Sequence, residues 1–327
     1  MSSRKRVGVV GVSGYGGGEI LRLCALHPGV QVAYAAGESS AGQRLGNRFP
    51  GLGGALADLT IQTFDPRNLP DLDVLFLSLP TGDSQKAAAE LPSDLKVIDV
   101  GGDHRFVDGW TYGLTEVTGP AAIADSSRVA DPGCFPAAAL LALAPLVSKA
   151  LVEPTQIIVD AKTGISGAGR GGGSTFGFAE INEDVSAYNL FKHAHTPEMR
   201  KAVSRMAGGA AASVIFSPHL VPMTRGILAT CYTRGRISTD QALKAAREFY
   251  AEAAFVRVTE QLPHSKWAQG TNLTFVSYAA DPGEEMVIAI GALDNLGKGA
   301  AGQAVQNMNL MLGLAETAGL ELVPMLP

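Results

Sequence analysis

The hydrophobic positions in the first half of the chain fall into short runs that polar or glycine-rich stretches separate. Four of these runs, at 6–12, 30–36, 72–79 and 95–100, have the length and composition of buried strands. Helix-length segments follow the first and the third run. Continuous apolar strands that alternate with helices are typical of a parallel sheet covered on both faces. The pattern therefore predicts a doubly wound α/β domain.

The second half follows a different pattern, in which β-rich segments outnumber helices. The strand-like segments lie at 155–161, 213–218, 227–236, 255–259, 273–278 and 286–293. This arrangement predicts an α+β domain built on a mixed sheet. The last apolar-rich segment, 300–318, predicts a long helix that returns to the first domain.

Composition narrows the class of protein. The chain has 327 residues, of which 46% are hydrophobic and 17% charged, enough material for two domains with a core each. The net charge of −5 and the lack of a basic tract argue against a nucleic-acid partner. The three cysteines are widely spaced and form no disulfide framework, which indicates a reducing cytoplasm. No signal peptide or membrane span is expected from the sequence.

The segment 131–136, Asp-Pro-Gly-Cys-Phe-Pro, carries the first candidate for chemistry. An apolar strand precedes it and an Ala/Leu-rich helix follows, so Cys134 is predicted at a helix N-terminus. Unpaired N–H groups and the macrodipole favour a thiolate there. The competing interpretation is a buried structural cysteine. The strand–turn–Cys–helix order favours a nucleophile.

The glycine-rich turn 11–17 stands between the first predicted strand and a helix. Its Gly-x-x-Gly-x-x-Gly spacing differs from the Gly-x-Gly-x-x-Gly dinucleotide fingerprint, and such turns also serve tight packing. Its position after the first strand favours a pyrophosphate resting on the helix N-terminus. After the second strand, Glu38 favours NAD, whereas Ser39, Ser40 and Arg44 favour the 2′-phosphate of NADP. The residues alone leave this choice open.

Polar residues also follow later predicted strands, where ligands bind in open α/β sheets. The segment 80–82 begins with Pro80, and Arg105 follows the fourth strand. Arg105 is either a surface charge or a clamp for a phosphate.

A dense titratable cluster, Lys-His-Ala-His-Thr-Pro-Glu, occupies 192–198. Thr196 and Pro197 predict the N-cap and first position of a helix, with His195 just ahead of it. The His-x-His pair lacks a third ligand at a suitable spacing, so no metal is expected. With a nucleophilic cysteine elsewhere, His195 becomes the candidate general acid and base.

Two further turns leave a structural and a functional interpretation open. The segment 217–226 carries His219 and Arg225 ahead of a strand and suits packing as well as a site. The segment 294–303 is a glycine-rich strand-to-helix turn, in which Asn295 and Lys298 are candidate ligand contacts.

Together these motifs resemble the N-acetyl-γ-glutamyl-phosphate reductase family, which is related to aspartate-semialdehyde dehydrogenase. The matching pieces span nearly the whole chain in the family's order: 11–17, 131–136, 164–170, 193–198, 219–226 and 294–303. The resemblance implies an NADP-binding Rossmann domain at 1–134 plus 304–327 and a catalytic and dimerisation domain at 135–303. It also implies a homodimer or homotetramer that reduces a small-molecule acyl phosphate.

The resemblance further implies roles for individual residues. Cys134 is the nucleophile and His195 the acid and base, and the reaction proceeds through a thioester. The expected cofactor contacts are Gly11, Ser13, Gly14, Tyr15, Gly16, Gly17, Ser39, Ser40, Arg44, Pro80, Asn295 and Lys298. The expected substrate contacts are Arg105, Gly167, His193, Glu198 and Arg225.

The chain departs from the family pattern at several places near the presumed substrate. Asp131 replaces an asparagine, the stretch 99–105 lacks a serine, and Thr115 replaces a proline. Two alternatives to reduction of an acetylglutamyl phosphate stay open. One is an aminoadipyl phosphate, carried on a protein or free, and the other is a non-catalytic NADP-binding regulator.

Overall fold

The computed structural model describes residues 4–170 and 177–324, which form two compact units. Unit 1 holds residues 4–132 and 300–322. Unit 2 holds residues 133–170 and 177–299 together with 323 and 324. The chain crosses between the units at 132/133 and 299/300, a few residues before the predicted boundaries.

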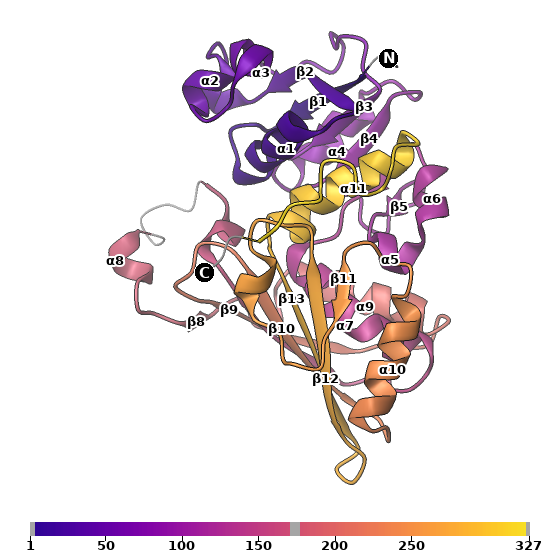
Figure 1. Ribbon diagram of the computed structural model, residues 1–327. Helices are drawn as coiled ribbons and strands as arrows, with labels where there is room; N and C mark the ends of the chain where they lie inside the picture. Colours follow the sequence, from indigo (N-terminus) through magenta and orange to yellow (C-terminus); the bar gives the residue numbers. More distant parts are fainter. Residues whose placement is uncertain (1–3, 171–176, 325–327) are drawn as a thin grey trace. The chain divides into compact units, whose positions relative to one another are not determined.

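Unit 1 is built on a six-stranded sheet in the order β2-β1-β3-β4-β6-β5, and all its strand pairs are parallel (Figure 1). The strands are β1 Lys5–Val10, β2 Val30–Ala36, β3 Val74–Leu77, β4 Lys96–Asp99, β5 Thr111–Tyr112 and β6 Arg128–Ala130. The four apolar runs of the first half form β1 to β4. The predicted Rossmann-type sheet is therefore confirmed.

Helices cover both faces of this sheet. In β3, Leu75 and Leu77 join an apolar cluster with Ala87 of α4, while Val74 and Phe76 are equally buried toward the opposite face. Helix α1 packs against α11, and α11 also contacts β4. The helices of unit 1 are α1 Tyr15–Leu26, α2 Leu45–Arg48, α3 Gly54–Asp58, α4 Asp83–Ala89, α5 Thr115–Thr118, α6 Pro120–Ala124 and α11 Gly302–Met311, with the 3₁₀ turn η1 Glu38–Ser40.

Unit 2 is built on a seven-stranded mixed sheet in the order β11-β12-β13-β10-β7-β9-β8. Its strands are β7 Ile157–Thr163, β8 Ser186–Ala187, β9 Val214–Leu220, β10 Ile227–Arg234, β11 Val256–Val258, β12 Thr274–Asp281 and β13 Met286–Leu293. Parallel pairs (β11 with β12, β7 with β9) occur beside antiparallel ones, which confirms the predicted mixed sheet.

The core of unit 2 is helix α7, Cys134–Ser148, whose residues 135–147 are all buried. An apolar helix of this kind needs neighbours on every side. Strands β10, β12 and β13 and the helices α9 His195–Met206 and α10 Thr239–Phe249 supply them. The shorter turns of the unit are α8 Phe178–Ile181, η2 Ile165–Ala168 and η4 Ser265–Ala268, and the π-turn η5 Gly297–Ala301 crosses into unit 1.

The predicted final helix, 300–318, is wrong in both limits. The π-turn η5 precedes α11, and α11 ends at Met311. Gly313 follows with a φ of +66°, the left-handed conformation that ends helices at glycine.

The predicted start of α9 is also wrong. The helix begins at His195, so Thr196 is not its N-cap. The N-cap is Ala194, and the side chain of His193, one residue earlier, accepts a hydrogen bond from the His195 N–H through its Nδ1 at 3.1 Å.

The segment 164–170, which resembles the family, contains the turn η2 and follows directly on the end of β7. No helix in the described part of the chain is long and apolar enough to cross a bilayer.

Candidate active site

The cysteine at the start of α7 has the environment of a reactive thiol. Cys134 is the first residue of the helix, and its N-cap is Gly133, which has no side chain. Cys134 is half-buried, whereas Cys24 and Cys231 are fully buried. Burial raises the pKa of Cys24 to about 12 and raises the pKa of Cys231 as well. Cys134 is therefore the cysteine placed to form a thiolate at a helix N-terminus.

His195 lies against the turn that carries Cys134. A Cβ built on Gly133 would lie 2.5 Å from Nε2 of His195, so any side chain at this position would displace the His195 ring. Helix α9, which starts at His195, packs against α7. An imidazole at this position can serve as acid and base for chemistry at Cys134.

The buried side chain of Glu198 binds the backbone of the turn that precedes Cys134. Its Oε1 accepts a hydrogen bond from the Gly133 N–H at 2.9 Å, and the residue is only 5% exposed. Glu198 lies one helical turn after His195, so a single helix supplies both groups. The carboxylate thereby fixes the backbone next to the nucleophile.

His193 and Tyr188 extend the site away from the nucleophile. The ring centroids of His193 lie 4.7 Å from His195 and 5.7 Å from Tyr188. Burial lowers the pKa of His193, and burial together with the charge of Cys134 raises the pKa of Tyr188. Both side chains are therefore uncharged near neutral pH. Across the described residues, no group of three His, Cys, Asp or Glu side chains could hold a metal ion.

The glycine-rich turn 294–299 forms another wall of the site. A Cβ on Gly299 would lie 2.9 Å from the Cβ of Cys134. At the start of the turn, Asp294 is fully buried, accepts three backbone N–H groups and pairs with Nε of Arg225 at 2.9 Å. This buried carboxylate orders the turn that packs on the nucleophile.

Asn295 and Lys298, two predicted cofactor contacts, are buried in unit 2. Asn295 accepts a hydrogen bond from the Gly226 N–H at 2.8 Å and donates one to Oγ of Ser166 at 2.9 Å. Lys298 has no exposed surface, and its Nζ lies 5.8 Å from the ring centroid of Phe255. Within unit 2, Asn295 connects the turn 294–299 to two neighbouring loops.

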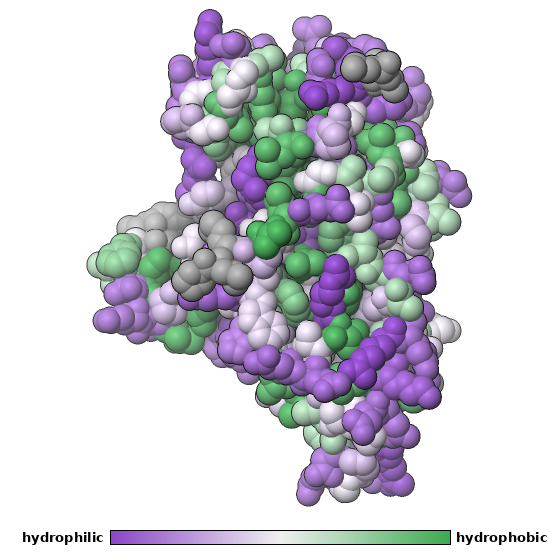
Figure 2. All heavy atoms as spheres, in the orientation of Figure 1, coloured by the Kyte–Doolittle hydropathy of each residue, from purple (hydrophilic) through white to green (hydrophobic). Residues whose placement is uncertain are grey.

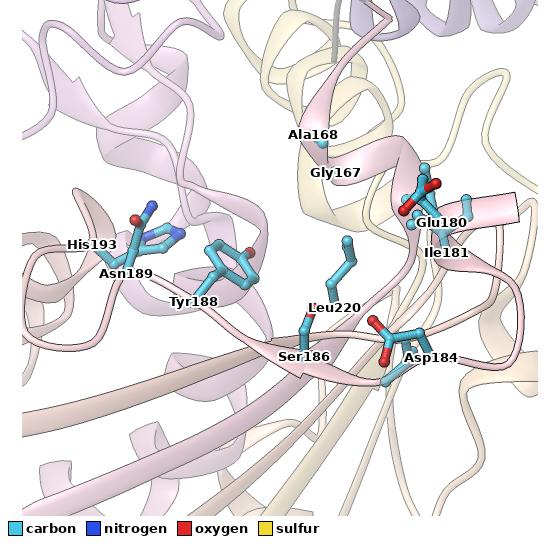
Figure 3. Close-up of a pocket in the computed structure, with 12 residues that line it drawn as sticks. Gly167, Ala168, Glu180, Ile181, Asp184, Ser186, Tyr188, Asn189, His193 and Leu220 are labelled. Atoms are coloured by element: carbon cyan, nitrogen blue, oxygen red, sulfur yellow. The ribbon is translucent and has the colours of Figure 1, made fainter. Parts of the chain in front are cut away.

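A pocket of about 610 Å³ opens beside the two histidines (Figure 3). The turn η2, helix α8, strand β8 and the end of β9 form it, and the predicted substrate contacts Gly167 and His193 line it. Figure 3 shows Tyr188 and His193 on one side of the pocket and the carboxylates of Glu180 and Asp184 on the other. The pocket thus has an uncharged side near the histidines and an acidic side opposite.

Unit 1 holds a second pocket, of about 650 Å³, at the carboxyl ends of β1, β2 and β3. Five predicted cofactor contacts line it: Gly11, Ser13, Gly14, Ser39 and Pro80. This is the edge at which open α/β sheets bind dinucleotides.

The glycines of the turn fit a bound pyrophosphate. A Cβ on Gly11, whose φ is +90°, would lie 2.0 Å from the Ser78 carbonyl oxygen. A Cβ on Gly17 would lie 2.3 Å from the Gly11 carbonyl oxygen. These two glycines allow close packing, while Gly14 caps α1 without a side chain and lines the pocket. The residues therefore fit a dinucleotide whose phosphates rest on the α1 N-terminus.

The remaining predicted cofactor contacts lie in unit 1 near this pocket but do not line it. Ser40 is 2% exposed, and its Oγ lies 2.6 Å from Oγ of Ser13. Arg44 is exposed and pairs with Asp58 at 3.2 Å. Tyr15, Gly16 and Gly17 belong to the turn and the first turn of α1.

Sequence reasoning missed several residues that line this second pocket, among them Phe64, Pro66, Ser78, Asp83, Lys86, Ala87 and Glu90. Lys86 and Glu90 are four residues apart at α4, so helical spacing after the third strand could have indicated them. Phe64 and Pro66 lie in a loop and carry no comparable signal.

Arg105, a predicted substrate contact, lies in unit 1. Its Nε donates to the carbonyl oxygen of Asp131 at 2.8 Å. The side chain of Asp131 is fully buried and accepts a hydrogen bond from Nδ2 of Asn307 at 3.0 Å. Arg105 therefore holds the backbone that follows β6, and Asn307 holds the side chain of Asp131.

Comparison with known proteins identifies the family. Residues 6–126 match the NAD binding domain of semialdehyde dehydrogenases, and residues 134–295 match their dimerisation domain. Proteins named N-acetyl-gamma-glutamyl-phosphate reductase from Bradyrhizobium sp. (strain ORS 278) and Methylobacterium sp. (strain 4-46) are 63% and 62% identical to this chain. Each alignment covers 98% of this chain and 99% of the relative. The chain therefore belongs to the semialdehyde dehydrogenase family and, within it, to the N-acetyl-gamma-glutamyl-phosphate reductases, which confirms the resemblance.

Solved structures agree on the fold. Aspartate semialdehyde dehydrogenase II from Vibrio cholerae, in complex with ASA, superposes with a TM-score of 0.74 at 19% identity, covering 95% of this chain and 99% of that one. The aspartate semialdehyde dehydrogenase with NADP from Candida albicans gives a TM-score of 0.72 at 16% identity, covering 95% of this chain. The cofactor class that follows from the matched binding domain is a nicotinamide dinucleotide.

Proposed function

We propose that the protein catalyses the NADPH-dependent reductive dephosphorylation of N-acetyl-γ-glutamyl phosphate to N-acetylglutamate semialdehyde. The observation that carries the proposal is the approach of His195 to Gly133, the residue before Cys134. It joins a candidate nucleophile and a candidate acid and base that are 61 positions apart in the sequence (195 − 134 = 61). The reductase names of the similar relatives support the substrate.

In the proposed mechanism the Cys134 thiolate attacks the carbonyl carbon of the acyl phosphate. The C–O bond to phosphate breaks, inorganic phosphate leaves, and a thioester on Cys134 forms. A nicotinamide cofactor bound in unit 1 would supply the hydride that reduces this thioester. The aldehyde forms as the C–S bond breaks, and His195 donates a proton to the departing sulfur.

Two predicted substrate contacts have different roles in this proposal. Arg225, ordered by Asp294, supplies positive charge in unit 2 for an anionic part of the substrate. Glu198 is buried and bound to Gly133, so we assign it to positioning the nucleophile rather than to binding substrate. Gly167 and His193 line the pocket beside the site, and Arg105 stays a proposed phosphate contact.

The proposed cofactor is NADP. Ser39 lines the nucleotide pocket, and its hydroxyl can donate to a 2′-phosphate. Arg44 carries an exposed guanidinium whose present partner, Asp58, is also exposed, and such pairs are held weakly. Glu38 lines the pocket as well and is exposed, so NADP binding requires its carboxylate to face solvent.

The proposed assembly is a homodimer or a homotetramer formed through unit 2, which matches a dimerisation domain. One face of its sheet packs on α7, α9 and α10. On the other face Ile158 and Ile215 are 41% and 42% exposed. Figure 2 shows further hydrophobic surface over the segment of α8 and β8, where Phe178 is 78% exposed. Covering these side chains with a second copy of the chain would bury them.

The test is the reverse reaction. Purified protein with N-acetylglutamate semialdehyde, inorganic phosphate and NADP should produce NADPH, and omission of phosphate should stop it. Because the mechanism needs a free thiol at Cys134, a reducing compartment such as the cytoplasm suits it.

The two rival functions give different results in this assay. Faster turnover of the corresponding aminoadipate semialdehyde would favour the aminoadipyl alternative. Absence of turnover with either aldehyde, together with measurable NADP binding, would favour a non-catalytic regulator.

A further inference from the structure

The pocket beside the histidines contains two uncharged hydrogen-bond donors. Neither of them has a role in the proposed reaction steps. His193 and Tyr188 stand on the same side of it (Figure 3). Neither the thiolate attack nor the proton transfer at His195 requires them. Their chemistry therefore indicates what else the pocket binds.

The backbone of α9 fixes the tautomer of His193. Its Nδ1 accepts the His195 N–H, so in the neutral ring the proton resides on Nε2. Burial lowers the pKa of His193, which keeps the ring neutral. Nε2 has no hydrogen-bond partner among the described residues, and the residue lines the pocket. His193 thus presents a fixed N–H donor.

Tyr188 supplies the second donor. Its ring centroid lies 5.7 Å from that of His193, and burial raises its pKa, so the hydroxyl keeps its proton. Two neutral donors that line the same pocket suit a neutral carbonyl oxygen, since a carboxylate gains more from a charged partner.

The charges of the pocket exclude an anionic group. The described residues that line it include the carboxylates of Glu180 and Asp184 but no lysine or arginine. An added carboxylate would be repelled and would find no cation. The apolar side chains of Ile165, Leu220 and Val221 suit a methyl group.

We propose that this pocket binds the uncharged acetamido group of the substrate, with His193 Nε2 and the Tyr188 hydroxyl donating to its carbonyl oxygen. The inference rests on the proposed function and names the residues that select an N-acylated substrate. The substrate's own α-carboxylate then lies outside the pocket.

The test compares two aldehydes that differ only in the acetamido group, N-acetylglutamate semialdehyde and glutarate semialdehyde. The measured quantity is the ratio of kcat/KM for the first to kcat/KM for the second. Tyr188→Phe removes one hydroxyl and keeps the ring. His193→Asn keeps an acceptor for the His195 N–H but loses the donor at Nε2. We expect each variant to lower the ratio by about 10-fold, the loss expected for one hydrogen bond to a buried group.

The control is Lys192→Gln, an exposed neighbour that does not line the pocket and should keep the wild-type ratio. If both substrates lose kcat/KM equally in the two variants, the donors serve the reacting carbonyl and the proposal is wrong. An unchanged ratio also overturns it.

A binding measurement separates this proposal from the proposed function. Calorimetric titration with N-acetyl-L-glutamate and with glutarate requires no turnover. Tighter binding of the acetylated ligand, lost in Tyr188→Phe and His193→Asn, supports the pocket assignment even if the aldehyde assay fails. Equal affinity of the wild type for both ligands contradicts it.

Discussion

The two units each place a glycine at the N-cap of a helix, but with different surroundings. In unit 1 Gly14 caps α1 with no side chain, and it lines a pocket. In unit 2 Gly133 caps α7, but its N–H is bound by Glu198 and its Cα is covered by His195. The first terminus stays open for a ligand, and the second is closed around a side chain of the protein.

This difference shows that the partial positive charge at a helix N-terminus can stabilise different kinds of anion. Where backbone alone surrounds it, it binds an external anion such as a phosphate. Where the first helical residue is a cysteine, the same field favours a thiolate. The neighbouring chain segments decide which use is made of it.

The largest effect should come from removing the nucleophile of unit 2. We expect Cys134→Ser to lower kcat by roughly 10⁴–10⁶-fold, as for other catalytic nucleophiles. Binding of NADP, measured by fluorescence titration, should stay within a few-fold of the wild type because its pocket belongs to unit 1. Retained turnover would eliminate the covalent mechanism.

The reactivity of the Cys134 thiol can also be measured without substrate, from its rate of alkylation. Iodoacetamide should label it roughly 10³-fold faster than Cys24 at neutral pH, because a thiol with a pKa of about 12 is almost never ionised there. Peptide mass spectrometry of the native protein measures the rates. Cys231, which is buried with a raised pKa, is the matched internal control. Equal rates at all three sites would contradict a reactive Cys134.

The next largest loss of kcat should come from removing the acid and base, His195. We expect His195→Asn to lower kcat by ~10²–10⁴-fold, the range for loss of such a group. His193→Asn should lower kcat less, because His193 caps α9 and lines the side pocket. Steady-state kinetics of both variants decide the order, and a larger loss for His193→Asn would reverse the assignment.

A matched pair of glycine variants tests the comparison of the two helix termini directly. In Gly133→Ala the new Cβ would lie 2.5 Å from the His195 ring, so we expect kcat to fall by about 10²-fold through misplacement. In Gly14→Ala the nearest atom is the Gly11 carbonyl oxygen at 3.5 Å, so the fold tolerates the methyl group. Because Gly14 lines the pocket of unit 1, we expect NADP affinity to fall with little change in kcat.

The control for this pair is Gly51→Ala, where no atom lies within 4 Å of the new Cβ. Thermal melting curves of the three variants would show whether any of them unfolds. The comparison of the termini is wrong if Gly133→Ala weakens NADP binding while Gly14→Ala lowers kcat.

The smallest effect concerns the choice of cofactor in unit 1. We expect kcat/KM to favour NADP over NAD in the wild type, and Ser39→Ala and Arg44→Ala each to reduce this preference by roughly 3- to 10-fold, the range for one exposed polar contact. A wild-type preference for NAD would refute NADP as the cofactor. An unchanged preference in both variants would refute the chosen contacts.

The sequence by itself determined the local structural features of this protein, namely its strands, turns and helix starts. Apolar runs with intervening helices determined the parallel sheet of unit 1, and the Pro-Gly-Cys-Phe-Pro segment determined a helix that starts at Cys134. These features depend on neighbours along the chain, whose preferences for turns, strands and helix starts are local.

Only the tertiary structure decided which side chains contact these turns and helix starts. Glu198 binds Gly133, Gly299 packs on Cys134, and Ser40 turns inward to Ser13 instead of lining the pocket. The start of α9 was missed for the same reason, because the His193 side chain and not Thr196 accepts the first N–H of the helix. Such contacts depend on how helices pack and on which glycine leaves space, and no spacing in the sequence encodes them.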